Sequence, residues 1–216
     1  MPAMHIHGLK LWDRMFGWKR RAEARATLRH VEPFLTLGSS VLDVGCGIGY
    51  VLDVLNTEFQ CTGYGCDVVK PPVDIERFAQ FDGVRLPYRD KSFDVAFLIF
   101  VLHHAEDPGL LLREASRVAR RSVVVLEDTP EQQFERGWGK VHIQSFAARH
   151  SIPWEGRVRS DEEWRQIFQF SSMPIQYAEK LGRFERLPPV TRTAFALQPA
   201  PLPAVAQEAI ARVATS

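Results

Sequence analysis

At 216 residues the chain is long enough for one domain with a full hydrophobic core, and short for two. Its 45% apolar and 25% charged residues are ordinary for a globular protein, which excludes a low-complexity or fibrous chain. The formal net charge of +1 provides no overall field that would attract nucleic acid.

Features that would send the chain to a membrane or out of the cell are not found. The longest apolar run, residues 95–102, is too short to span a bilayer, and residues 1–5 do not have the pattern of a signal peptide. Cys46, Cys61 and Cys66 are expected to be unpaired thiols, as in a reducing compartment. We therefore expect a cytoplasmic protein.

The periodicity of apolar residues predicts helices and strands in alternation. Residues 9–35 have helical spacing, and Pro33 and Gly38 mark the end of that segment. Strands that alternate with helices at this pitch imply right-handed βαβ units and a doubly wound α/β sheet. The later elements are predicted as strands at 41–44, 61–67, near 80–82, 93–100, 122–126, 175–181 and 191–197, helices at 50–58, 108–119 and 161–170, and a short final helix after the proline-rich residues 199–203.

The first strand leads into a glycine-rich turn, Val-Leu-Asp-Val-Gly-Cys-Gly-Ile-Gly at residues 41–49. Gly45, Gly47 and Gly49 let the backbone turn tightly and approach a bound molecule, since no Cβ stands in the way. Tyr50 occupies the third-glycine position of the dinucleotide fingerprint, which disfavours a nicotinamide cofactor. Taken alone, the turn also fits an ordinary connection from strand to helix.

Two carboxylates follow later strands of the predicted sheet. Asp67 ends the second strand, 18 positions beyond Gly49, close to the offset of a ribose-binding acid, and the alternative is a turn-forming role before Val68. Asp82 ends the third strand and can accept a hydrogen bond from the amino group of adenine, or it forms an Asx turn before Gly83. Ligands of such sheets bind at the carboxyl ends of the strands, where both residues are expected.

Together with Leu86-Pro87-Tyr88 and the run from Ser92 to His104, these residues resemble the motifs of the class I S-adenosylmethionine-dependent methyltransferases. Within that class the sequence is most similar to the branch of small-molecule and quinone methyltransferases. The resemblance covers about residues 38–128. It implies a Rossmann-like seven-stranded sheet with an antiparallel last strand, S-adenosyl-L-methionine as cofactor and S-adenosyl-L-homocysteine as product. The cofactor-binding residues that it implies are Asp43, Gly45, Cys46, Gly47 and Gly49 at the methionine end, Asp67 at the ribose, Val68, Asp82 and Gly83 at the adenine, and Ile99 and Phe100 at the amino group.

The candidate catalytic residues are His104, which is preferred, and His103, just past the fourth strand. With an ordinary pKa of about 6.5, a histidine can accept a proton at neutral pH; the alternative is packing beneath the sheet. Some quinone methyltransferases of this branch have Glu-x-x-Glu-His here and use a divalent metal. Both carboxylates are absent from residues 100–104, so no metal is expected.

Acceptor-binding residues are expected outside the shared sheet. Glu127 ends the fifth strand, and it either contacts the substrate or caps a turn. Trp138, His142 and Phe146 recur at intervals of four, a stripe that continues to His150 and Trp154. On a helix such a stripe is either the buried face or a lid over an apolar or aromatic acceptor.

The sequence thus predicts an enzyme, a methyltransferase that modifies oxygen or nitrogen, rather than carbon, of a small organic acceptor. The alternatives are an RNA or protein methyltransferase, which would dock its polymer on the basic first helix, and a non-catalytic cofactor-binding module. No nucleic-acid partner or membrane span is expected, and the oligomeric state is left open. The predicted domains are a helical cap at 1–37, a methyltransferase domain at 38–198 with a lid insertion around 129–160, and a tail at 199–216.

Overall fold

A mixed seven-stranded sheet organises the molecule. The computed structural model describes residues 11–150, 156–181 and 190–200. Its strands are β1 (Ser40–Val44), β2 (Thr62–Asp67), β3 (Phe78–Gln80), β4 (Phe93–Ile99), β5 (Ala119–Asp128), β6 (Ile175–Leu181) and β7 (Arg192–Leu197). The strand order is β3-β2-β1-β4-β5-β7-β6, and β7 runs antiparallel to both of its neighbours while the pairs from β3 to β5 are parallel. The predicted Rossmann-like sheet with an antiparallel last strand is confirmed.

Two of the helices begin at capping residues that the sequence predicts. Asp107 accepts a hydrogen bond from the amide of Leu110 at 2.9 Å, and Ser160 and Glu163 form a capping box. The helices are α1 (Leu11–Val31), α2 (Tyr50–Thr57), α3 (Pro108–Val118), α4 (Gln133–His150) and α5 (Asp161–Phe170), with 3₁₀ turns η1 (Glu32–Phe34) and η2 (Leu102–His104).

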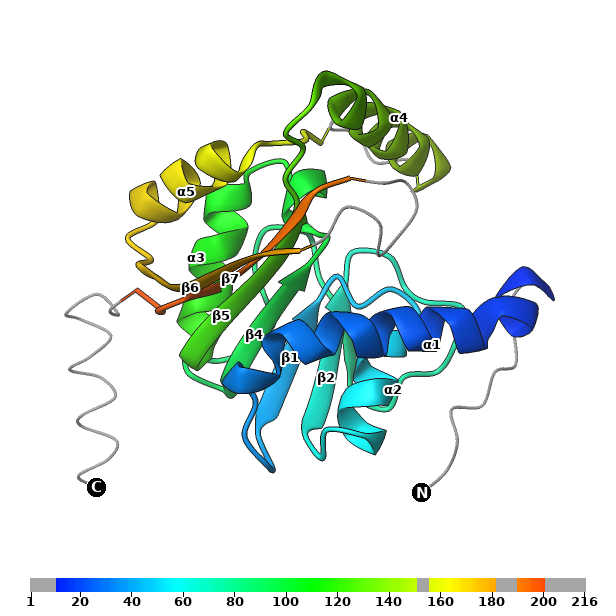
Figure 1. Cartoon of the computed structure of the whole chain (residues 1–216). Helices are drawn as coiled ribbons and strands as arrows, with labels where there is room; N and C mark the ends of the chain where they lie inside the picture. The colour runs from blue at the N-terminus through cyan, green and yellow to red at the C-terminus, as the bar shows by residue number, and fades with distance from the viewer. Residues whose placement is uncertain (1–10, 151–155, 182–189, 201–216) are drawn as a thin grey trace.

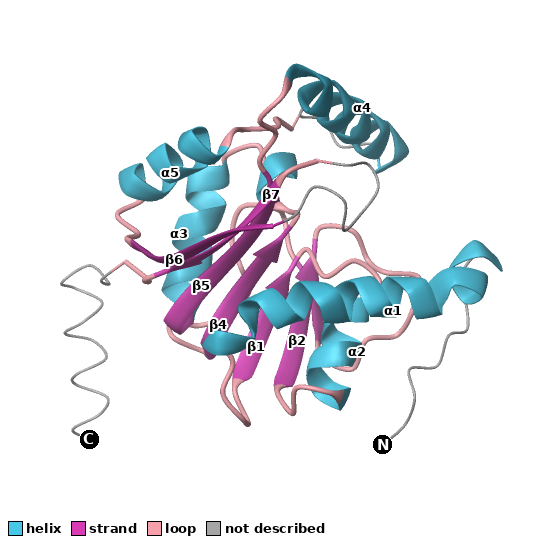
Figure 2. Cartoon of the chain, viewed as in Figure 1, coloured by secondary structure: helices cyan, strands magenta, loops and turns pink. Residues whose placement is uncertain are grey.

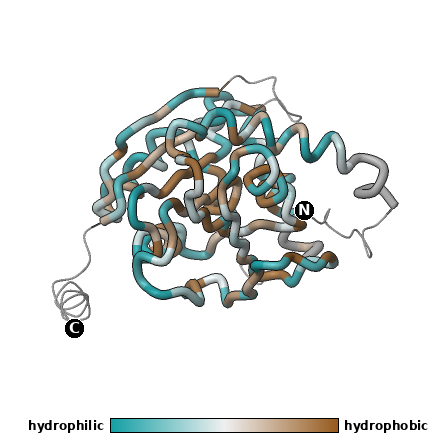
Figure 3. Tube along the Cα trace, turned by 90° about the horizontal axis from the view of Figure 1, so that it is seen from below, coloured by the Kyte–Doolittle hydropathy of each residue, from teal (hydrophilic) through white to brown (hydrophobic). Residues whose placement is uncertain are grey.

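Helices cover both faces of the sheet, with α1 and α2 on one face and α3 and α5 on the other (Figure 1). In β1, Val41 packs in the cluster of the first face, with Leu28 of α1, whereas Leu42 packs in that of the second, with Leu112 of α3. Hydrophobic stretches of chain therefore gather at the centre (Figure 3). Helix α4 lies beyond the carboxyl ends of the central strands (Figure 2).

Some predicted boundaries are wrong. The first helix ends at Val31 and not near residue 35, because Pro33 cannot continue an α-helix and the chain forms η1 instead. Strand β5 is longer than predicted, since it starts at Ala119 directly after α3. The predicted final helix lies outside the described residues.

The amino-terminal helix is integrated with the sheet. Leu28 and Val31 are fully buried in the same core cluster as Val41 and Phe97. The domain boundaries predicted from the sequence stay predictions. Among the described helices, none is both long and apolar enough to cross a bilayer.

Candidate active site

The glycine turn connects β1 to α2 at the carboxyl edge of the sheet. Gly45 has φ +74°, and a Cβ there would lie 2.4 Å from Cγ2 of Val101, so only glycine fits. Gly47 also has positive φ, +53°, but a Cβ on it would meet nothing within 4 Å. The turn therefore packs tightly against the protein at Gly45 and presents bare backbone to open space at Gly47. Gly49, at φ +84°, is the N-cap of α2.

Asp67 ends β2 beside this turn, as predicted. Its Oδ2 accepts a hydrogen bond from the amide of Gly47 at 2.9 Å, and its Oδ1 accepts one from the amide of Val69 at 2.9 Å. The side chain is half-buried, so the carboxylate stays within reach of a ligand. Val68 accepts a hydrogen bond from Nε2 of Gln80 through its carbonyl, which joins the ends of β2 and β3.

A buried carboxylate lies under the turn. Asp43 is 2% exposed, and burial together with the charge of Asp67 raises its pKa to about 8. A cationic ligand would favour the ionised form of Asp43 and so relieve this cost. Burial also raises the pKa of the Cys46 thiol, which lies so close to β2 that a Cβ on Gly65 would be 2.7 Å from its Sγ.

Asp82 adopts the turn that the sequence offers as its alternative role. Its Oδ1 accepts hydrogen bonds from the amides of Val84 and Arg85, both at 2.8 Å, and these bonds lower the pKa of the carboxyl. Gly83, at φ +85°, lies within this Asx turn. The residue is exposed. A role in holding adenine stays a prediction.

At the end of β4 the backbone is strained. Phe100, which follows Ile99, has φ +56°, a left-handed conformation that costs a non-glycine residue about 1–3 kcal/mol. Its amide donates to the carbonyl of Leu126 at 2.8 Å, which holds the bend against β5. Such strain is concentrated at ligand sites, and the bend turns the chain directly into η2.

Glu127 holds η2 in place. The side chain is fully buried, and its Oε1 accepts hydrogen bonds from the amides of Val101 at 3.0 Å and Leu102 at 2.7 Å. Its Oε2 lies 2.5 Å from Nδ1 of His103. Burial lowers the pKa of His103, but the charge and hydrogen bond of Glu127 outweigh it, so the pKa is raised overall. The capping role that the sequence offered for Glu127 is the one observed, and contact with a substrate stays a prediction.

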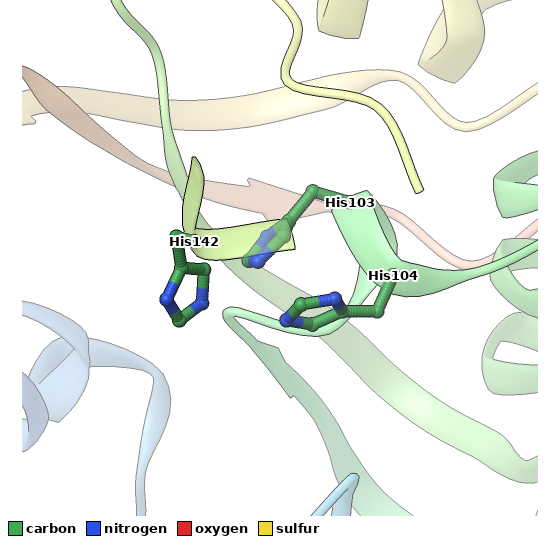
Figure 4. Close-up of side chains that lie close together, drawn as sticks. All are labelled: His103, His104 and His142. Carbon is green, nitrogen blue, oxygen red and sulfur yellow. The ribbon is translucent and has the colours of Figure 1, made fainter. Parts of the chain in front are cut away.

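Three histidines meet beyond η2 (Figure 4). His103 is buried, His104 is half-buried, and His142 is an exposed residue of α4. The ring centroids are 4.1 Å apart for His103 and His104, 5.8 Å for His103 and His142, and 5.4 Å for His104 and His142. The two predicted catalytic residues and one residue of the predicted stripe are therefore neighbours.

The stripe itself is not the buried face of α4. The buried line of this helix is Glu135, Gly139 and Ile143, whereas Trp138 is 55% exposed. The helix is held at its start by Glu135, whose Oε2 accepts a hydrogen bond from the amide of Glu131 at 2.7 Å. The interpretation of the stripe as a packed face is thus wrong at Trp138 and His142, while a role as a lid stays a prediction. The side chains of Phe146 and His150, and all of Trp154, lie outside the described residues.

A contact that the sequence analysis missed fixes the position of η2. The amide of Arg157 donates to the carbonyl of His103 at 2.8 Å, and a Cβ on Gly156 would lie 2.1 Å from that oxygen. A similar close approach joins Gly139 of α4 to Val158, since a Cβ there would be 2.5 Å from Cγ2 of Val158. Gly139 and Gly156 could have indicated close contacts from the sequence, but nothing in the sequence shows which segment approaches each of them.

The sheet order, the glycine turn and the carboxylate at the end of β2 define a methyltransferase fold, and comparison with known families agrees. Residues 42–126 match the family described as "Methyltransferase domain". Over these residues, which are less than half of the chain, the protein is similar to methyltransferase domains.

Individual relatives match part of the chain. "Probable tRNA methyltransferase 9B" of Mus musculus is 36% identical over 88 residues, which are 38% of this chain and 19% of the relative. "27-O-demethylrifamycin SV methyltransferase" of Amycolatopsis mediterranei is 31% identical over 123 residues, 50% of this chain and 45% of the relative. The chain thus spans less than half of either protein.

Similarity of fold extends further along the chain. The methyltransferase in complex with the Trm112 methyltransferase activator of Haloferax volcanii superposes with a TM-score of 0.65 at 18% identity, covering 88% of this chain and 95% of that one. At this identity the likeness concerns the fold alone.

Proposed function

We propose that the chain binds S-adenosylmethionine and transfers its methyl group to oxygen or nitrogen of a small organic acceptor. The observation that carries the proposal is the convergence at one edge of the sheet. The bare glycine turn and Asp67 lie at the ends of β1 and β2, and two histidines lie just past the end of β4. One group of residues thus suits a cofactor, and the other suits an acceptor.

The residues present fit the cofactor. When bound, S-adenosylmethionine supplies an electrophilic methyl group on a cationic sulfonium sulfur. The cofactor can approach the backbone closely at Gly47, because this residue has no side chain and the space beside it is open. Asp43 offers a buried carboxylate that favours a positive ligand. Asp67 and Asp82 offer carboxylate oxygens to ribose hydroxyls and to the adenine amino group, the roles implied by the family resemblance.

The histidine cluster offers a base that can remove a proton from the acceptor. His104 is less buried than His103, whose Nδ1 is already engaged by Glu127, so His104 is the proposed base for an acceptor that must lose a proton. Helix α4 covers this end of the sheet and carries the exposed Trp138, which suits contact with an apolar or aromatic molecule. Removal of water around the acceptor is the contribution expected of α4.

A small acceptor is favoured over RNA by the charge pairing of α1. On this basic helix, Arg21 pairs with Asp53 of α2 and with Glu58, which directly follows α2, and Arg25 also pairs with Glu58. Arginines that are already paired with carboxylates attract the phosphates of RNA less strongly. The name of the Amycolatopsis relative, an O-methyltransferase of a small molecule, supports the proposal, whereas the name of the mouse relative supports a tRNA acceptor.

The test is a methyl-transfer assay with radiolabelled S-adenosylmethionine. Phenols, hydroxylated macrocycles, amines and bulk tRNA are offered in parallel, and calorimetry measures cofactor affinity for the wild type and for Asp67→Asn. We expect transfer to a small acceptor and weaker cofactor binding by the variant. Labelling of tRNA alone would replace the proposal with the RNA alternative, and the absence of cofactor binding by the wild type would refute it.

A further inference from the structure

We infer that His103, His104 and His142 form a binding site for a divalent transition-metal ion of the zinc type. Each residue offers one imidazole nitrogen, and the three nitrogens lie within 4.8 Å of one another. Two of them come from η2 and the third from α4, so the site joins the sheet to the helix that covers it (Figure 4). The expectation that no metal is bound was based on the absence of two carboxylates from residues 100–104, and it does not apply to a site made of histidines.

The environment of His103 is that of a metal ligand. Its Nδ1 is held by the buried carboxylate of Glu127 at 2.5 Å, which leaves Nε2 to face the cluster. That nitrogen is buried and has no hydrogen-bond partner among the residues that the structure describes. Histidines that bind metals usually have their second nitrogen held by a carboxylate or carbonyl in this way. A buried polar atom without a partner is costly, and a metal ion would satisfy it.

The ligand set selects the type of metal. Imidazole nitrogens suit zinc and its neighbours in the transition series, whereas magnesium prefers oxygen. Three protein ligands with one open position are the arrangement of catalytic zinc sites. Zinc–nitrogen bonds of about 2.0–2.1 Å place tetrahedral ligands about 3.4 Å apart, so the nitrogens have to approach one another. His142 is exposed on α4, so a change of its side-chain rotamer can shorten these distances.

A metal here would change how the acceptor loses its proton. A hydroxyl oxygen in the open position becomes more acidic, so its proton can leave to solvent without a histidine to take it. The histidines would then act as ligands and not as bases. This consequence rests on the proposed methyl transfer, whereas the metal site itself does not.

The experiment measures metal binding directly on the full chain, produced without a histidine tag. The protein is stripped with a chelator and titrated with Co²⁺, followed by visible absorption, and with Zn²⁺ in competition with a chromophoric chelator. The variants are His142→Ala, on the exposed surface of α4, and the control His30→Ala, a half-buried histidine on α1 outside the cluster. Cofactor affinity is measured by calorimetry on the same samples.

We expect about one metal ion per chain in the wild type and in His30→Ala, and affinity lowered by at least about tenfold in His142→Ala. A wild type that binds neither ion, or His142→Ala with unchanged affinity, would overturn the site. If cofactor binding persists in either case, the proposed function stands without the metal. If the metal binds and the cofactor does not, the site stands and the proposed function fails.

Discussion

Gly47 provides the sharpest test of where the cofactor lies, because the chain contains a matched control. Gly47 and Gly38 are both exposed, both have positive φ (+53° and +77°), and a Cβ on either would meet nothing within 4 Å. They differ in position. Gly47 lies in the turn at the carboxyl end of β1, whereas Gly38 precedes its amino end. Substitution with alanine therefore carries the same backbone cost at both sites but adds a methyl group to the proposed cofactor site at only one.

The magnitudes follow from these geometries. A left-handed conformation costs an alanine about 1–2 kcal/mol, so urea denaturation should show a similar loss of unfolding free energy for Gly47→Ala and Gly38→Ala. Calorimetric titration with S-adenosylmethionine should then separate them. Gly47→Ala should lose at least about tenfold in affinity, or about 1.4 kcal/mol, because its methyl group takes the space of the ligand. Gly38→Ala should bind as the wild type does.

Two results would refute this reasoning. If Gly47→Ala keeps wild-type affinity, the cofactor does not approach the turn at this residue. If both variants lose affinity equally, the loss reflects general destabilisation and not local contact. Equal unfolding free energies with unequal affinities are the expected outcome.

Three further predictions concern charged residues. The pKa of Asp43 is raised to about 8, so this carboxyl is protonated at neutral pH, and binding of the cationic cofactor at pH 7 should release up to about one proton. The release should vanish well above pH 8, where the carboxyl is already ionised. Calorimetry in two buffers of different ionisation enthalpy measures the number of protons released, and no release at pH 7 would contradict the role of Asp43 beside the cofactor. Glu127→Gln should lower the unfolding free energy by about 1–3 kcal/mol, since its carboxylate satisfies two amides and a histidine, whereas Glu131→Gln, on an exposed ion pair with Lys180, should change it by less than about 1 kcal/mol. Arg117→Met should lower the unfolding free energy, measured by urea denaturation, by about 1–3 kcal/mol, because the guanidinium of Arg117 donates to two backbone carbonyls and two carboxylates. A loss no larger than that of Arg120→Met, at an exposed arginine, would contradict this.

Most of the sheet could be predicted because its signals are local. The apolar run at 93–100 and the glycines after Val44 place β4 and the turn correctly, and Ser160 places the start of α5. The antiparallel last strand was implied by the family resemblance alone, and the order of the strands is known only from the structure, since pairing joins segments that are far apart along the chain.

The site was predicted only in part. Asp67 lies beside the glycine turn as its offset suggested, because both follow parallel neighbouring strands whose ends meet at one edge. For Glu127 the sequence left substrate contact and a turn cap as alternatives, because a residue at a strand end looks the same whether it faces a ligand or caps the next turn. Its role depends on η2, which lies 25 residues earlier in the chain.

The sequence alone determined the alternation of helices and strands, the bend of the chain after β1 and the carboxylates that flank it. These depend on backbone preferences and short-range hydrogen bonds, which neighbouring residues control. Only the tertiary structure decided that His142 of α4 meets His103 and His104, with the intervening β5 providing Glu127 beneath them. The reason is that α4 packs closely on Val158 and the segment around Gly156 packs closely on η2, and packing between distant segments leaves no periodic trace along the chain.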